Sequence, residues 1–264
     1  MKIATHLPGG PCWAELSTPD VGVAHAFYGG LFGWEGMSAD SQAAPYMTLT
    51  LHGELTGAMR LAADVPASWD IYFTSQDLAW TSTMVEAAGG RVVSAARQVL
   101  DRGSSAYFRA PDGAGFGAWQ PGARAGVGLM REPGALAWFE LNTPDPGLAT
   151  SFYTDVFGWL STSHANGDFT YTDLKVPGAT MEFGGITPRL AGWPKAVPIQ
   201  WTPYFAVQDA DATAAKASEL GGAVASAPRT VGNIGRIAAL LDPHGAAFSA
   251  ISAPPASGQG PIPS

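Results

Sequence analysis

The feature that most constrains the fold of this chain is an internal repeat. Residues 13–34 read WAELSTPDVGVAHAFYGGLFGW, and residues 138–159 read WFELNTPDPGLATSFYTDVFGW. A second set of matches follows at an offset of 132 positions, from Tyr72 to Tyr204 for example. Tyr-Phe, Gly-Gly and Pro-Asp-Gly of the first half return in the second half as Tyr-Phe, Gly-Gly and Pro-His-Gly. So many shared positions in fixed register indicate a duplication, which predicts two similar folded units.

Each half divides into two modules that begin with a strand and a helix. In the first half the pattern predicts a strand at 13–16, then a helix that begins near Thr18-Pro19-Asp20 and ends at Gly33. Thr and Asp side chains cap helix amides, and Gly ends helices. The remaining elements expected in this half are strands at 46–51 and 55–61, a strand at 71–74, a helix at 78–88, and strands at 106–109 and 116–120. This order predicts an α+β fold.

Glycine and proline mark the expected domain boundaries. We predict an N-terminal domain at 1–121, a Gly- and Pro-rich linker at 122–135 and a C-terminal domain at 136–253. The last stretch, 254–264, reads PPASGQGPIPS and has no apolar periodicity, which predicts a flexible tail.

Charge and composition argue against several classes of function. The net charge is −8 and no run of Lys and Arg occurs, which argues against nucleic acid or an anionic membrane surface as a partner. No apolar stretch approaches the roughly 18 residues that a membrane span needs, and the first residues do not resemble a signal peptide, so we expect a cytoplasmic protein. A single cysteine, Cys12, excludes a disulfide framework within the chain.

The repeated TPD…FY…FGW and the PDG or DPHG turn before each last strand resemble the vicinal oxygen chelate superfamily of glyoxalases, bleomycin-resistance proteins and extradiol dioxygenases. Within it, the chain is most similar to two-domain, glyoxalase-like actinobacterial proteins of about 27 kDa. The resemblance implies two tandem domains, each of two βαβββ modules that curl into a concave mixed sheet around a cavity. It also implies a family metal site with one ligand on each of four strands.

The positions that match those metal ligands hold no metal-binding side chains. None of the eight is a histidine or a carboxylate, whereas a divalent ion needs several oxygen or nitrogen ligands. We therefore expect no metal and no other cofactor, which argues against metal-dependent glyoxalase or dioxygenase activity. The eight residues are Trp13, Met59, Ile71 and Gly117 in the first half, and Trp138, Ile186, Pro203 and Ser249 in the second.

Two glutamates are the candidate catalytic residues. If Trp13 and Trp138 face the cavities, strand alternation turns Glu15 and Glu140 the same way. A carboxyl group beside an indole in an apolar pocket has a raised pKa and can act as a general acid or base. The alternative is that each glutamate is held in a salt bridge or by the backbone. The candidate ligand-binding residues are Trp13, Met59, Phe73, Trp119, Trp138 and Phe205.

These residues favour a metal-independent protein that binds a flat, largely apolar small molecule. The leading hypothesis is a tailoring or accessory enzyme of secondary metabolism with an aromatic, polyketide-like ligand. The alternatives are a drug-sequestering protein of the bleomycin-resistance type without turnover, and a residual glyoxalase or lyase. The net charge of −8 suits a cationic ligand. We expect a monomer or homodimer, and the sequence leaves open which half carries the functional pocket.

Overall fold

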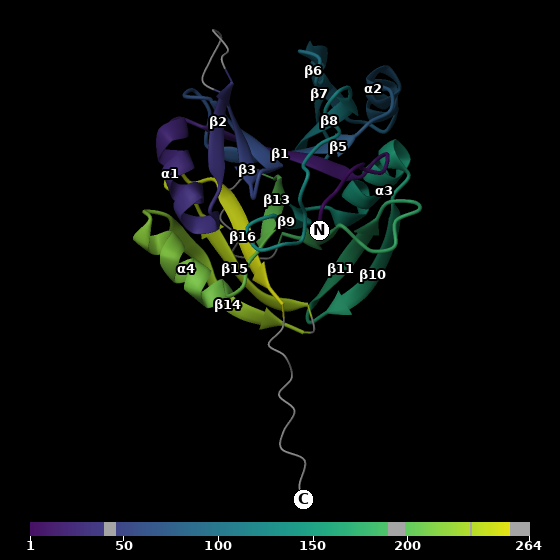
Figure 1. The fold of residues 1–264 in the computed structure, drawn as a ribbon. Coiled ribbons are helices and arrows are strands. Elements are labelled where there is room, and N and C mark those ends of the chain that lie inside the picture. Colours follow the sequence, from purple (N-terminus) through teal and green to yellow (C-terminus); the bar gives the residue numbers. More distant parts are fainter. Residues whose placement is uncertain (40–45, 190–198, 233, 254–264) are drawn as a thin grey trace, which may run out of the picture.

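The computed structural model describes residues 1–39, 46–189, 199–232 and 234–253, and the expected tail at 254–264 lies outside the described residues. Two eight-stranded sheets and four helices make up the fold (Figure 1). The helices are α1 (Val21–Phe32), α2 (Leu78–Ala87), α3 (Pro146–Phe157) and α4 (Ala210–Glu219). This architecture confirms the α+β fold with two similar halves.

The N-terminal sheet has the strand order β2-β3-β4-β1-β5-β8-β7-β6. It is mixed, because β1 runs parallel to β4 and antiparallel to β5. Each module contributes one strand, one helix and three further strands, as the resemblance implies. The strands are β1 (Pro11–Thr18), β2 (Glu35–Ala39), β3 (Tyr46–Leu51), β4 (Glu54–Leu61), β5 (Ser68–Thr74), β6 (Arg91–Val99), β7 (Gly103–Arg109) and β8 (Gly115–Pro121).

The C-terminal sheet repeats this order as β10-β11-β12-β9-β13-β16-β15-β14. Its central pair, β9 and β13, is antiparallel like β1 and β5. Its strands are β9 (Leu136–Thr143), β10 (Leu160–Asn166), β11 (Phe169–Lys175), β12 (Gly184–Pro188), β13 (Trp201–Ala206), β14 (Ala223–Val231), β15 (Gly235–Leu241) and β16 (Ala247–Ser252). No helix in the described part of the chain is long and apolar enough to cross a membrane.

The helices begin and end as the sequence pattern predicts. At the start of α1 the Asp20 carboxylate accepts a hydrogen bond from the Val23 amide at 3.0 Å. Gly33 follows the helix with a left-handed φ of 77°, a conformation that glycine adopts without strain. Asp145 and Gly158 repeat both features around α3. The same cap chemistry therefore sets the strand-to-helix geometry in both halves.

An aromatic interior joins the two halves. Phe73 of β5 packs against rings of the other half, with its centroid 4.9 Å from that of Trp159 and 5.4 Å from that of Trp201. Phe205 of β13 makes the reciprocal contact with Trp34 at 5.2 Å. Trp34 and Trp159 are buried, and their indole N–H groups donate to the backbone carbonyls of Gly134, in the segment between the halves, and of Gly9, in the N-terminal half. The repeated FGW corners thus belong to the core between the halves.

Candidate functional site

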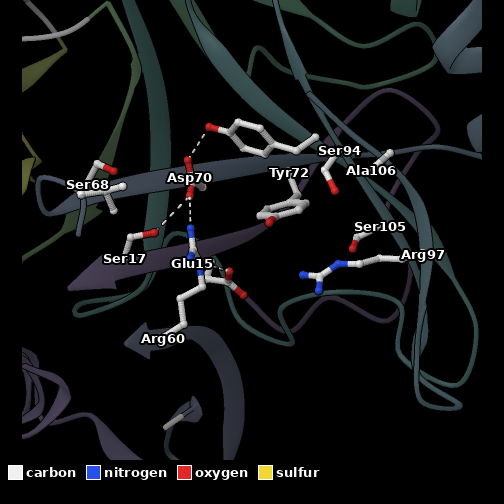
Figure 2. Close-up of a pocket in the computed structure, with 12 residues that line it drawn as sticks. Glu15, Ser17, Arg60, Ser68, Asp70, Tyr72, Ser94, Arg97, Ser105 and Ala106 are labelled. Atoms are coloured by element: carbon white, nitrogen blue, oxygen red, sulfur yellow. Dashed lines mark hydrogen bonds and ion pairs between the residues drawn. The ribbon is translucent and has the colours of Figure 1, made fainter. Parts of the chain in front are cut away.

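A cavity of about 490 Å³ opens on the N-terminal sheet (Figure 2). Arg60 of β4 and Arg97 of β6 both line it, although four strands separate β4 from β6 in the sheet. The sheet therefore curls around the cavity. An adjoining space of about 120 Å³ shares Glu15, Arg60, Tyr72, Arg97 and Ser105 with it and adds Trp13, Tyr46, Val99, Arg102, Trp119 and Arg124.

Strand alternation decides which side chains reach the cavity. On β1, Trp13, Glu15 and Ser17 line it, while the intervening Ala14 and Leu16 are fully buried in the core. On β5, the lining residues are Ser68, Asp70 and Tyr72, and the intervening side chains of Trp69, Ile71 and Phe73 are buried in the core. The two central strands thus present polar and aromatic groups to the cavity.

Glu15 and Asp70 stand directly opposite each other on β1 and β5. Two carboxylates in such a cross-strand pair repel each other. Arg60 relieves this repulsion, because its Nε lies 3.0 Å from Glu15 Oε1 and its Nη2 lies 3.6 Å from Asp70 Oδ2. Figure 2 shows the guanidinium group between the two acids. One arginine therefore holds two carboxylates at the cavity floor.

The Glu15 side chain is only 11% exposed. Burial raises its pKa, and the attraction of Arg60 and a hydrogen bond with Tyr46 oppose that rise. Arg97 reaches toward it from the opposite side of the cavity (Figure 2). A carboxyl group with a raised pKa and access to a cavity can take up and release a proton.

Asp70 is more tightly held than Glu15. The Tyr107 hydroxyl donates to its Oδ1 at 2.5 Å, and the Ser17 hydroxyl donates to its Oδ2 at 3.3 Å. Burial raises the pKa of this carboxyl group, while Tyr107 and Arg60 oppose the rise. Because its oxygens accept these hydrogen bonds, Asp70 positions Arg60 and Tyr107, whereas Glu15 is the acid beside the aromatic wall.

Aromatic rings form one wall of the smaller space. Trp13, Tyr72 and Trp119 line it, and the Arg124 guanidinium lies 5.4 Å from the centre of the Trp13 ring system. The Trp119 indole N–H donates to the backbone carbonyl of Arg124 at 2.9 Å, which fixes its ring. Flat rings held in this way can stack on a planar ligand.

The C-terminal half holds a different arrangement around Glu140. Tyr171 donates its hydroxyl to Glu140 at 3.2 Å, and Trp138 donates to the Tyr171 oxygen at 3.1 Å. Burial raises the pKa of Glu140, and the hydrogen bonds from Tyr204, Asn142 and Tyr171 oppose that rise. Among the described residues no basic side chain forms an ion pair with Glu140.

The two halves have diverged at the positions that make the N-terminal cluster. Thr202 stands opposite Glu140, where Asp70 stands opposite Glu15. Thr187 holds the register position on β12 that Arg60 holds on β4. The charged cluster therefore belongs to the N-terminal half, where the cavity lies.

Comparison with known proteins places the chain in a family. The family model described as glyoxalase/bleomycin resistance protein/dioxygenase superfamily matches residues 135–249. The chain is 37% identical to CFP32 of Mycobacterium tuberculosis (strain CDC 1551 / Oshkosh), a protein provisionally named a glyoxylase. The alignment, 267 positions long, covers 96% of this chain and 98% of that protein. The chain belongs to the glyoxalase/bleomycin resistance protein/dioxygenase superfamily.

Other members of the superfamily resemble the whole chain. The anthracycline biosynthesis protein DnrV of Streptomyces peucetius is 36% identical over 265 residues, covering 92% of this chain and 93% of that protein. The Mn(II)-bound glyoxalase of Novosphingobium aromaticivorans has a TM-score of 0.67 at 20% identity and covers 93% of this chain and 82% of its own. The 2,3-dioxygenase LapB of Pseudomonas sp. KL28 has a TM-score of 0.66 at 17% identity, with coverages of 96% and 95%. These structures share the fold.

The residues of this superfamily member do not fit a divalent metal in the N-terminal cavity. Glu15 and Asp70 are its two carboxylates, and both already accept contacts from the Arg60 guanidinium, a cation that repels a metal ion. Within the described ranges no group of three or more His, Cys, Asp or Glu side chains is placed to hold a metal ion.

The structure brings some of the predicted site residues together. Trp13, Glu15 and Trp119 share the N-terminal cavity, and Trp138 lies near Glu140 in the other half.

The structure does not bring Met59, Phe73 and Phe205 to the cavity. All three are fully buried in the core. The reason is strand alternation, because Met59 pairs with Leu16 on the core face, and Phe73 is one residue past the cavity-facing Tyr72.

Sequence reasoning missed most of the polar residues of the cavity. Arg60, Asp70, Tyr72, Arg97 and Tyr107 come from four strands, and only the strand pairing brings them together. One signal was available on β5, where SWDIYFT alternates polar or amphipathic with apolar side chains.

Proposed function

We propose that the N-terminal cavity binds a flat, largely apolar small molecule and that Glu15 moves a proton to or from it without a metal. The observation that carries this proposal is the position of Glu15, a buried carboxyl group with a raised pKa that lines the cavity beside Trp13 and Tyr72. A general acid or base needs both access to the ligand and a pKa moved toward neutrality.

The other cavity residues support this chemistry. Arg60 stabilises the ionised form of Glu15. Burial favours its protonated form, so both protonation states of Glu15 are accessible. Trp13, Tyr72 and Trp119 orient a planar ring system by stacking. The reaction class that fits is removal of a proton from a carbon next to a carbonyl group, followed by its return at another atom, as in isomerisation or ring closure.

The relatives suggest the biological setting. DnrV and DauV are named as anthracycline biosynthesis proteins, and both match most of this chain. We infer a tailoring or accessory role in secondary metabolism, with a polyketide-like aromatic substrate, which agrees with the aromatic wall of the cavity.

Proton exchange into a model ketone tests the proposal. The probe 2-acetyl-1-naphthol is flat and aromatic, and NMR in D₂O reports exchange of its methyl protons. We expect the protein to accelerate exchange and Glu15→Gln to lower that acceleration by about 100-fold or more, while the affinity for the probe changes only a few-fold. Glu140→Gln is the matched control and should keep the exchange rate. Unchanged exchange in Glu15→Gln would refute the role of this residue.

A second candidate function is sequestration without turnover. It is favoured by the 3.0 Å contact between Glu15 and Arg60, since a carboxylate held in an ion pair is a weaker base. The same experiment separates the two functions: tight binding of the probe with no accelerated exchange in the parent protein supports sequestration.

A further inference from the structure

Three arginines surround the smaller space of the cavity. Arg97 of β6, Arg102 and Arg124 line it together with Arg60. We call Arg97, Arg102 and Arg124 the arginine cluster. These four arginines are a large share of the 14 basic residues of a chain with net charge −8, so the space is locally basic in an acidic protein.

In the part of the chain that the structure describes, the arginines of this cluster form no direct ion pair with a carboxylate. Among the described residues only Arg60 of the four has a carboxylate within ion-pair distance. Asp101 attracts Arg124, and Glu15 attracts Arg97, in both cases from beyond that distance. Arg102 and Arg124 line the same space, where burial and then the like charge of Arg102 lower the pKa of Arg124.

Such a group of cations is unfavourable in the free protein and becomes favourable when an anion binds between them. Arginine suits this role because its planar fork can hold two oxygens of a carboxylate at once. The aromatic wall lies in the same space, and Arg124 itself lies over Trp13. An occupant that satisfies both features has a flat ring system and a negatively charged oxygen group at one end.

The C-terminal half supplies an internal comparison. The residue 132 positions after Arg102 is Ile234, and the register position of Arg60 on β4 is held by Thr187 on β12. Of these three, Arg97 has a basic counterpart, Arg229. Arg102 and Arg60 thus accompany the cavity and the Glu15 site, and the repeated fold does not require them.

We propose that the ligand of the N-terminal cavity is an anion, an aromatic molecule whose ring bears an ionised carboxylate or an acidic enol or phenol oxygen held by the arginine cluster. This inference rests on the proposed function and names its substrate class. It also replaces the cationic ligand suggested by net charge, because the charge that a ligand meets is that of the lining residues.

Calorimetric titration with two matched probes tests the proposal. Anthraquinone-2-carboxylate and anthraquinone-2-carboxamide have the same ring system and nearly the same size, and differ in charge. We expect the carboxylate to bind about tenfold more tightly or better, and its affinity to fall as salt rises from about 50 mM to about 500 mM. The carboxamide affinity should change little with salt.

Substitutions assign the effect to the arginine cluster. Arg102→Gln and Arg124→Gln should each weaken carboxylate binding about three- to tenfold and leave carboxamide binding unchanged. Arg91→Gln is the matched control, because Arg91 lies exposed on β6 and does not line either space. Circular dichroism confirms that each variant is folded.

The outcomes separate this inference from the proposed function. Equal affinity for both probes, or carboxylate binding that Arg102→Gln and Arg124→Gln leave unchanged, overturns the anionic ligand and leaves the flat-ligand cavity intact. Failure of both probes to bind overturns the proposed function and the inference with it. Selective carboxylate binding that the two variants weaken and Arg91→Gln does not supports both.

Discussion

Replacing Arg60 by methionine removes the charge that holds the cavity floor together. Glu15 and Asp70 face each other across β1 and β5, and Arg60 is the cation within ion-pair distance of both in the described part of the chain. Methionine keeps a long unbranched side chain, so Arg60→Met isolates the loss of charge from a loss of packing.

The expected magnitude follows from the two contacts at 3.0 and 3.6 Å. With an effective dielectric constant of about 20, each attraction is worth about 5 kcal/mol before desolvation. The Arg60 side chain is 41% exposed, so solvent screens much of this. Breaking a fully buried pair costs about 3–5 kcal/mol and an exposed pair less than about 1. We therefore expect a loss of about 2 kcal/mol at about pH 8.

The loss should depend on pH in a defined direction. Burial raises the pKa of both carboxyl groups, and Arg60 opposes this rise, so its removal raises both pKa values further. A carboxyl group with a raised pKa in the folded state favours folding at low pH, and this contribution disappears as pH rises through the folded pKa. The deficit of Arg60→Met should therefore be larger at about pH 8 than at about pH 5.

Thermal unfolding at the two pH values measures the effect. A loss of about 2 kcal/mol corresponds to a decrease of about 4–8 °C in melting temperature for a chain of this size. Adding Glu15→Gln to Arg60→Met should recover part of the loss at about pH 8, because one of the two facing charges is removed. Arg91→Met serves as a control for loss of a basic residue. An equal loss at both pH values, or no loss, would refute the reasoning.

Three further outcomes are expected. Phe73→Leu should lower the free energy of unfolding by about 1 kcal/mol and leave the affinity for anthraquinone-2-carboxylate unchanged. Tyr72→Leu should weaken that affinity several-fold, because Tyr72 lines the cavity. If both variants weakened binding equally, Phe73 would lie at the ligand. Gly117→Ala would make the new Cβ overlap the Tyr72 ring, so we expect the free energy of unfolding in urea to fall by about 2 kcal/mol, and an unchanged midpoint would contradict this. Burial raises the pKa of the Cys12 thiol to about 12. A thiol reagent at about pH 8 should therefore modify Cys12 in urea but not in the folded protein. Rapid modification of Cys12 in the folded protein would contradict its burial.

The fold could be predicted because the repeat and the residues that begin and end its helices are recognisable from short stretches of sequence. Helix caps and the aromatic FGW corners can be recognised from neighbouring residues, and the structure confirms these elements. Strand β6 (Arg91–Val99) was not predicted from the sequence, because nearly all of its residues are exposed and it lacks the alternation of a half-buried strand. Its place is set by pairing with β7, a contact between strands that no local pattern records.

The candidate site was predictable only where one strand carries it. Trp13 and Glu15 lie two residues apart on β1, so alternation alone puts both on the cavity face. Met59 and Phe73 were expected at the ligand but lie on the core face, and a shift of one residue along a strand reverses the face. The adjacent Arg60 and Tyr72 are the residues that line the cavity.

Electrostatics explains how the residues around Glu15 and Glu140 differ between the two halves. Glu140 stands opposite a threonine, so hydrogen bonds from tyrosine and asparagine side chains are enough to hold it. Asp70 places a second carboxylate opposite Glu15, and that arrangement is stable only with a cation between them. Asp70 and Arg60 therefore form one unit with Glu15. The same fold can accommodate either arrangement, since the differing side chains face the cavity and leave the shared core unchanged.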